Sequence, residues 1–318
     1  MANRKKIVQI VLKTTSEKIC KICVRPSTTA PPTHPPYYIM RYNLLIICLL
    51  SALAAAAEPD SLLRPVVSGW AAEVGSSHLR DTYLTPVQYS GWHAAVDYER
   101  LQVAPFGRGR WVMQLRATVN LGSTDNRRQT ATMWHFNFRP EWALMHRFTI
   151  PALAPVKFAA GGIASANVGG LYLLRNSNNP VSLQASATVG ATAMAWWNTR
   201  LASRPLTLRY QADMPVVGAF FAPDYDQLYY EIYLGNRSGL CHAAWPGNFF
   251  RLNNLLTADW RFGSNYLRLG YRLEVFSSKA AGIVSRRVEH SFVIGFTTEW
   301  LAVGTRHKPD AAILSPLY

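Results

Sequence analysis

The chain has 318 residues and a formal net charge of +15, but much of that charge is concentrated at its front. Eight of the 33 basic residues and one of the 18 acidic residues lie in residues 1–57, which leaves 25 and 17 and a net charge of +8 for the rest. This excess is spread without a long basic run, which argues against a nucleic-acid partner. Of the four cysteines only Cys241 lies beyond residue 57, so that part cannot form an internal disulfide.

The front of the chain divides into two segments. Residues 1–39 are basic and end in a proline-rich run, and we expect them to be a gene-model extension, with a genuine long prepeptide as the alternative. Residues 40–57 read as a secretory signal peptide, with Arg41 before the apolar core Leu44–Leu53 and the small residues Ala54–Ala57 after it. The mature chain is then expected to be residues 58–318.

The mature chain repeats one pattern, in which apolar and polar residues alternate with the period of a β-strand. The pattern is clearest over Tyr266–Phe276, where leucine, tyrosine and valine alternate with arginine, glycine and glutamate. Such runs recur over residues 111–120, 134–139, 181–190, 206–213, 228–234, 266–276 and 291–300, with weaker candidates over 66–75, 92–103, 155–165 and 252–262, and one or two further strands are allowed near 142–150 and 167–174. They predict an all-β fold, an antiparallel up-and-down transmembrane β-barrel of about twelve strands.

The segments between the runs contain turn residues. Residues 123–126, 176–180 and 263–265 are predicted turns, and the last joins two strong strands as a periplasmic hairpin does. The longer segments 77–90 and 235–251 are expected to be extracellular loops or lid-like insertions. The last strand is expected to end near Trp300, followed by a short periplasmic tail from about residue 301.

A secreted soluble β-sandwich also alternates, so three further features decide between the two folds. Tryptophans lie near the ends of several predicted strands, as in the aromatic girdles of membrane barrels. The polar faces carry many charges, and the signal peptide directs the chain out of the cytoplasm. These features favour the membrane barrel, and the soluble β-sandwich binding protein remains an alternative.

In a barrel, the polar faces line the lumen. The residues expected to face it are Arg116, Arg209, Asp213, Glu231, Asp259, Arg261, Arg268, Arg272 and Glu274. Opposite charges at this density predict either a salt-bridged plug that stabilises the barrel or the lining of a narrow polar passage. The sequence leaves both interpretations open.

No pattern in the mature chain predicts catalysis. His290 and Ser291 are adjacent, so a strand directs them to opposite faces. His93, His135, His146 and His242 each lack a second ligand at metal-binding spacing. We therefore expect no catalytic residue, no cofactor and no metal site, and we expect that the protein is not an enzyme. A lipid-modifying outer-membrane hydrolase is the alternative, which needs an outward-facing His/Ser pair on neighbouring strands.

Two segments carry a family resemblance. His78–Pro86, continuing to Tyr89–Gly91, resembles the opening motif of an uncharacterised exported outer-membrane family of Bacteroides-type bacteria, known as a domain of unknown function; Gln227–Tyr233 is also similar to it. The resemblance covers most of the mature chain and brings no catalytic residue with it. Asp81–Pro86 is either a loop packed on the barrel rim or an element that contacts a substrate.

Together these observations predict a monomeric, non-enzymatic protein in the outer membrane of a Gram-negative bacterium. Its role is expected to be a narrow channel, the binding of a surface ligand or structural support of the envelope. The expected partners are outer-membrane lipid, the barrel-assembly machinery and a small polar solute.

Overall fold

The computed structural model describes residues 62–301, except 178, 225–226, 236–237 and 264, and residues 312–317. The expected extension (1–39) and signal peptide (40–57) lie outside the described residues, as does most of the segment expected to be the tail. Within the described residues, no helix is both long enough and apolar enough to cross a membrane.

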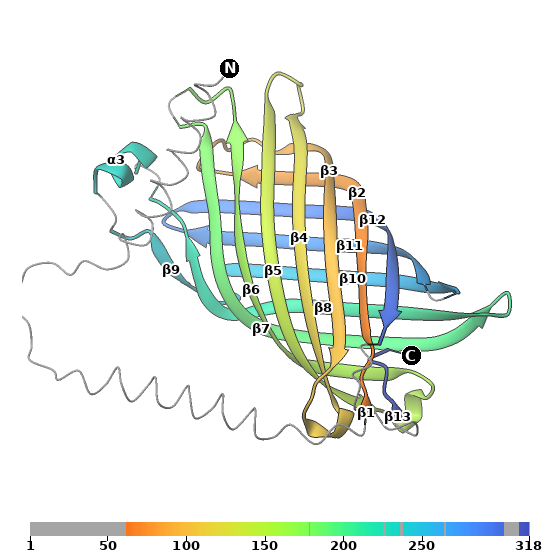
Figure 1. Cartoon of the computed structure of the whole chain (residues 1–318). Coiled ribbons are helices and arrows are strands. Elements are labelled where there is room, and N and C mark those ends of the chain that lie inside the picture. The colour runs from red at the N-terminus through yellow and green to blue at the C-terminus, as the bar shows by residue number, and fades with distance from the viewer. Residues whose placement is uncertain are drawn as a thin grey trace, which may run out of the picture. The chain divides into compact units, whose positions relative to one another are not determined.

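Ten long antiparallel strands form a closed barrel (Figure 1). They are β2 (Val66–Asp81), β3 (Tyr89–Val103), β4 (Trp111–Asn126), β5 (Thr132–Thr149), β6 (Lys157–Leu173), β7 (Val181–Leu201), β8 (Arg204–Phe221), β10 (Phe249–Phe262), β11 (Asn265–Ala280) and β12 (Ile283–Trp300). Each strand pairs with the next in this order, and β12 pairs with β2, which closes the sheet.

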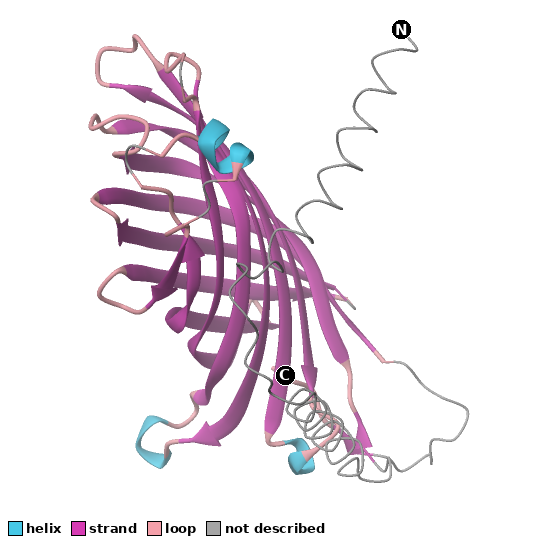
Figure 2. Ribbon diagram, turned by 90° about the vertical axis from the view of Figure 1, so that its left-hand side faces the viewer, coloured by secondary structure: helices cyan, strands magenta, loops and turns pink. Residues whose placement is uncertain are grey.

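The remaining elements are short. β9 (Cys241–Ala244) pairs with the end of β8, and β1 (Leu62–Leu63) pairs in parallel with β13 (Ala312–Ile313). Three helical segments, η1 (Gly107–Gly109), η2 (Pro151–Leu153) and α3 (Tyr229–Leu234), lie in connections between strands. Figure 2 shows that nearly all of the described chain is strand, with the helical segments near the strand ends.

The up-and-down order places the connections at two ends of the barrel, which we call the terminal end and the loop end. The terminal end holds the start of β2, the end of β12 and residues 104–110, 150–156, 202–203 and 263–264. The loop end holds residues 82–88, 127–131, 174–180, 222–248 and 281–282, so it carries the longest connection. In Figure 1, β1 and β13 mark the terminal end and α3 marks the loop end.

The alternation predicted from sequence is inverted relative to a soluble sheet. On β11, Arg268, Arg272 and Glu274 are buried, whereas Leu269 and Tyr271 are exposed. The same holds around the barrel, where the polar face of each strand turns inward and the apolar face outward. A soluble β-sandwich has the opposite arrangement, with an apolar core, so the sandwich alternative is wrong for this chain.

The expected number of about twelve strands is wrong, and three segments account for the difference. Runs 134–139 and 142–150 are one strand, β5, which continues through Pro140. Runs 155–165 and 167–174 are likewise one strand, β6. The run 228–234 is not a strand, because its residues Tyr229–Leu234 form the helix α3, which ends at Gly235 in a left-handed conformation (φ 114°).

One predicted turn and one predicted loop have different bounds in the structure. Residues 123–126 belong to β4, and the turn follows at 127–131. The expected loop 77–90 is reduced to residues 82–88, because β2 runs to Asp81 and β3 begins at Tyr89. The predicted hairpin between β10 and β11 is confirmed across residues 263–264.

Candidate functional site in the barrel lumen

The middle of the lumen is filled with charged side chains of both signs. Seven arginines are buried there: Arg116, Arg139, Arg209, Arg251, Arg268, Arg272 and Arg287. Eight carboxylates are buried beside them: Glu73, Asp97, Glu99, Glu141, Asp213, Asp259, Glu274 and Glu289. The two signs nearly balance, so the cluster neutralises itself and does not present a ring of one sign to a passing solute.

The ion pairs of this network span the barrel. Glu99 on β3 contacts Arg209 on β8 at 2.9 Å and Arg268 on β11 at 2.5 Å. Arg116 on β4 contacts Asp213 on β8 at 2.5 Å. None of these strand pairs are neighbours in the sheet, so the bonds cross the interior. Such close cross-barrel pairs leave little room for a continuous water-filled path.

A second set of cross-barrel pairs lies nearer the loop end. Arg139 on β5 contacts Glu274 on β11 at 2.7 Å. Arg251 on β10 donates to Glu141 on β5 at 3.1 Å. Arg287 on β12 does not reach across the barrel: it contacts Glu274 on the adjacent strand β11 at 3.3 Å and Glu289 on its own strand at 3.5 Å, and both contacts are longer than the pairs above. Arg287 is thus the more loosely held guanidinium of this set.

Seven of the nine residues predicted to line the lumen lie inside the barrel and are buried: Arg116, Arg209, Asp213, Asp259, Arg268, Arg272 and Glu274. Glu231 does not, because it lies on α3 in a loop-end connection and not on a strand. Arg261 has the inward register, but it lies at the end of β10, where its side chain is exposed and donates to the Gly263 carbonyl.

Sequence reasoning found seven members of this network and missed eight. They are Glu73, Asp97, Glu99, Arg139, Glu141, Arg251, Arg287 and Glu289. Most lie in strands predicted only weakly or too short, such as β2, β3 and the second half of β5. The alternation of each strand would have found them, because each lies an even number of residues from other lumen-facing residues on its own strand.

A serine–histidine pair lies within the lumen. Ser291 Oγ on β12 is 3.2 Å from His93 Nε2 on β3, whereas the adjacent His290 faces outward and bonds Tyr271 at 2.5 Å. Ser291 and His93 are nearly inaccessible to solvent, at 2% and 1% exposure. His93 Nδ1 has no hydrogen-bond partner among the described residues, so no acid orients this histidine as in a catalytic triad.

The terminal end is closed by apolar side chains. Leu317 is buried there with Met145, Met194 and Trp196, and Leu314 packs against the same cluster. Arg147 donates to the Ser315 carbonyl at 3.2 Å, and Asn198 donates to the Leu317 carbonyl at 3.0 Å. Residues 314–317 therefore fold back onto the barrel, and the expectation that the tail extends past it is wrong for this part.

The loop end is partly closed by the connection 82–88. Tyr83 and Leu84 are buried in an apolar cluster with Leu79, Met133 and Leu171. The Tyr83 hydroxyl donates to the Gln227 carbonyl at 2.9 Å, and burial raises the pKa of this phenol. The first interpretation of Asp81–Pro86, a loop packed on the barrel rim, matches this arrangement.

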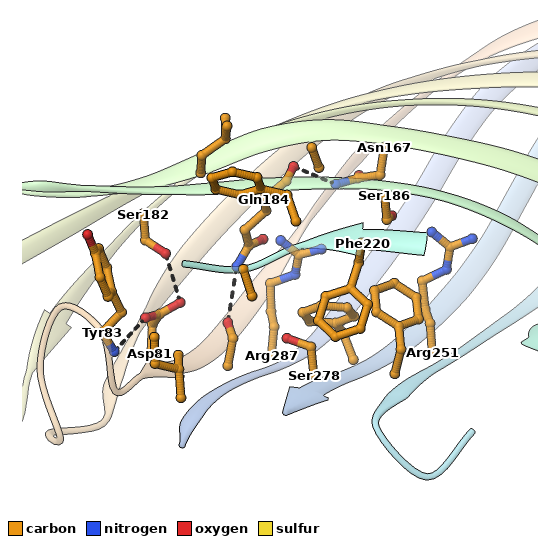
Figure 3. A pocket seen from close by; sticks show the side chains of 18 of the residues that line it. Asp81, Tyr83, Asn167, Ser182, Gln184, Ser186, Phe220, Arg251, Ser278 and Arg287 are labelled. Carbon is orange, nitrogen blue, oxygen red and sulfur yellow. Dashed lines mark hydrogen bonds between the residues drawn. The ribbon is translucent and has the colours of Figure 1, made fainter. Parts of the chain in front are cut away.

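Asp81 ties that connection to the opposite wall. Its carboxylate accepts from the Tyr83 backbone N–H at 3.0 Å and from Ser182 Oγ at 3.2 Å (Figure 3). Ser182 lies on β7, far from β2 in the sheet order, so this bond also crosses the barrel. Asp81 is only 1% exposed.

Beside this connection the loop end opens into a pocket of about 620 Å³, a volume that includes its solvent-open mouth. Phe220, Phe249 and Phe276 form one wall, with ring centroids 5.2 Å apart for Phe220–Phe249 and 5.4 Å for Phe249–Phe276. Arg251 and Arg287 lie beside these rings among the pocket residues (Figure 3). The pocket thus joins an apolar wall to guanidinium groups.

The barrel wall beside the pocket is incompletely paired. β8 pairs with β10 only over Leu206–Asp213, opposite Asn253–Trp260. Beyond a register shift opposite Val189 and Gly190, Gly218–Phe221 pair with β9 instead. Pro215, at the shift, has no N–H to donate to a neighbouring strand. In the described part of the chain β9 has no pairing with β10, so no strand ladder joins the two sides of the wall here. Phe220, Ala244 and Phe249 pack across this stretch as a buried cluster; we call it the β8–β10 seam.

Among the described residues, no group of three or more His, Cys, Asp and Glu side chains could hold a metal ion. Cys241 is an exposed free thiol on β9. The described residues of the lumen and pocket offer ion pairing, hydrogen bonding and apolar contact.

Fold and interior together define a class: a closed antiparallel β-barrel with an apolar exterior and a charge-paired lumen. The chain belongs to the DUF3316 family, described as a protein of unknown function, whose model matches residues 42–307. The expected membership of a family of unknown function is confirmed, and the Bacteroides-type origin stays a prediction.

Several solved structures are similar in fold at low sequence identity. The outer membrane protease OmpT from Escherichia coli has 6% identity and a TM-score of 0.40, covering 74% of this chain and 96% of that one. The translocator domain of the autotransporter NalP from Neisseria meningitidis has 8% identity and a TM-score of 0.36, covering 83% and 98%. The COG4313 outer membrane channel from Pseudomonas putida F1 has 8% identity and a TM-score of 0.30, covering 76% and 99%. No curated protein matches the chain.

Proposed function

We propose that this protein resides in the outer membrane of a Gram-negative bacterium. The observation that carries the proposal is the exterior of the barrel, where large apolar side chains are exposed in mid-strand: Val119, Phe136, Phe138, Leu256, Tyr271 and Phe292. An exterior of this kind is unfavourable in water and stable in lipid.

Tryptophans flank this apolar band on both sides, which supports the same proposal. Trp92 and Trp134 are exposed towards the loop end, and Trp70, Trp197 and Trp300 are exposed towards the terminal end. Indole rings favour the two interfaces of a bilayer. The terminal end then faces the periplasm, and the loop end, with the long connection 222–248, faces outward.

We further propose that the lumen is a plug and that the protein binds a ligand at its loop end. The network pairs its charges across the barrel, and apolar clusters lie on either side of it, which favours a plug over a passage for a small polar solute. The pocket at the loop end favours ligand binding over a purely structural role in the envelope. A barrel that closes on its own strands needs no second copy, so we expect a monomer, inserted by the barrel-assembly machinery.

The enzyme alternative is favoured by one observation, the 3.2 Å contact between Ser291 and His93. Three features oppose it. Both residues are buried, no acid orients His93 among the described residues, and His135 beside it is paired with Glu289 at 3.0 Å. A nucleophile must reach its substrate, and this serine lies within the plug. We therefore propose a non-enzymatic role.

Fractionation of cells that produce the full chain tests the location. We expect the protein in the outer-membrane fraction, released only by detergent, and migrating faster in gels before boiling than after it. A folded barrel retains its closed sheet in detergent, which is the reason for the shift in migration. Recovery of the protein from the soluble periplasm without detergent would contradict the proposal.

A further inference from the structure

We propose that the loop-end pocket binds an amphipathic anion, a molecule with one carboxylate or phosphate group and an acyl or aryl tail, which enters from the membrane through the β8–β10 seam. This inference rests on the proposed function, because it requires the barrel to be embedded in lipid. It assigns the chemical class of the ligand and its route.

The anionic group is assigned to Arg287. This side chain is 6% exposed, and its Nη1 has no hydrogen-bond partner among the described residues. Its two contacts with carboxylates, at 3.3 Å and 3.5 Å, are long compared with the pairs in the middle of the lumen. A buried N–H donor without a partner is unfavourable, and a carboxylate or phosphate oxygen would satisfy it.

The neighbouring groups permit an added negative charge. Glu274, which shares Arg287, is held independently by Arg139 at 2.7 Å, so an anion can engage Arg287 without leaving this carboxylate unpaired. Arg251 lines the same pocket, and its Nε also has no hydrogen-bond partner among the described residues. Two buried guanidinium groups thus have donors available at one site.

The tail is assigned to the phenylalanine wall. Phe220, Phe249 and Phe276 are inward-facing residues of β8, β10 and β11 that line the pocket, and Figure 3 shows Phe220 near Arg287 and Arg251. Aromatic rings next to arginine form a site with an apolar part and a cationic part. A simple inorganic anion would leave this wall uncovered, so the geometry favours an amphiphile.

The route is assigned from strand pairing. The pocket is lined by Phe220–Pro223 and by Phe249, the residues that flank the β8–β10 seam. On the outer surface near this seam Val216, Val217 and Trp245 are exposed, which continues the apolar band of the barrel up to the seam. In this proposal a ligand dissolved in the outer leaflet passes between Phe220 and Phe249, which close the seam only by side-chain packing, and reaches the pocket without crossing water.

Titration calorimetry on the protein in lipid nanodiscs, against empty nanodiscs, tests the proposal with dodecanoate as the probe. We expect saturable binding, and at least about tenfold weaker binding of dodecanol, because a charged hydrogen bond to Arg287 is lost. Benzoate carries the same head group but remains in water, and we expect it to bind at least about tenfold more weakly. Equal binding of dodecanol would overturn the assigned head-group site, and equal binding of benzoate would overturn the membrane route.

Arg287→Gln supplies the residue-specific arm, and Arg286→Gln is its matched control on the opposite face of the same strand. We expect at least about tenfold weaker dodecanoate binding for Arg287→Gln and unchanged binding for Arg286→Gln. Samples are first checked for heat-modifiable migration. If the barrel inserts into the membrane and does not conduct, but its dodecanoate binding does not depend on Arg287, this inference alone is overturned. If the protein is soluble or conducts ions, the proposed function is overturned.

Discussion

Arg268→Met is expected to lower the free energy of unfolding by about 3–5 kcal/mol, the cost of breaking a buried ion pair by removing one partner. Arg268 holds Asp259 through two bonds, at 2.7 Å and 2.9 Å, and Asp259 is 0% exposed. Without the guanidinium this carboxylate stays buried with no compensating charge. Glu99, the other partner, retains Arg209. Urea titration of the protein folded in phospholipid vesicles, followed by tryptophan fluorescence, measures the change.

Two further variants separate the ion pair from a general loss of packing. Adding Asp259→Asn to Arg268→Met removes the unpaired charge, so the double variant should be more stable than the single one. Arg261→Met, at the exposed end of the neighbouring strand, should change the stability by no more than about 0.5 kcal/mol. A double variant no more stable than Arg268→Met would show that the charge is not the cause.

Phe292→Arg is expected to lower the stability of the barrel in a bilayer by about 2–4 kcal/mol, because it places a cation on the lipid-facing surface near the middle of β12. Phe292 is 53% exposed, and its partners on the two adjacent strands, Tyr271 and Val74, are also exposed apolar residues. In a water-soluble barrel the same change would be nearly neutral, because an exposed arginine is well solvated. Urea titration in vesicles measures this variant too.

Leu201→Arg is the depth control for that experiment. Leu201 is equally exposed, at 53%, but it lies at the last residue of β7, where the bilayer interface is expected. There the cost should fall to about 0–1 kcal/mol. Equal costs at the two positions, or no cost at Phe292, would contradict a membrane-spanning exterior.

Much of the barrel was predictable from the sequence because strand alternation is a local property. The pattern over Tyr266–Phe276 assigns Arg268, Arg272 and Glu274 to one face, and the structure places all three in the lumen. The runs on the two sides of Pro140 count as separate strands in the prediction, whereas β5 continues through this proline, paired with Ala117 of β4 and interrupted only in its ladder to β6.

Other features depend on contacts that no local pattern encodes. The helix α3 has the sequence Tyr-Tyr-Glu-Ile-Tyr-Leu, whose apolar and aromatic residues fit either secondary structure at this length, and Gly235 after it was the available sign of a helix end. The ion-pair partners across the barrel depend on how the sheet closes, since Arg116 meets Asp213 only when β4 faces β8. The pocket depends on the register shift near Pro215, which separates β8 from β10.

Electrical recording from planar lipid bilayers tests the central claim most directly, namely that the charge-paired lumen is a plug. The purified barrel, first shown to be folded by heat-modifiable migration, is added to one side and the current is recorded in concentrated potassium chloride. The cross-barrel pairs of Glu99, Arg116 and Arg268 predict insertion without stable conductance steps. Reproducible single-channel steps from the unaltered protein would contradict the plug and would establish a conducting passage through the lumen.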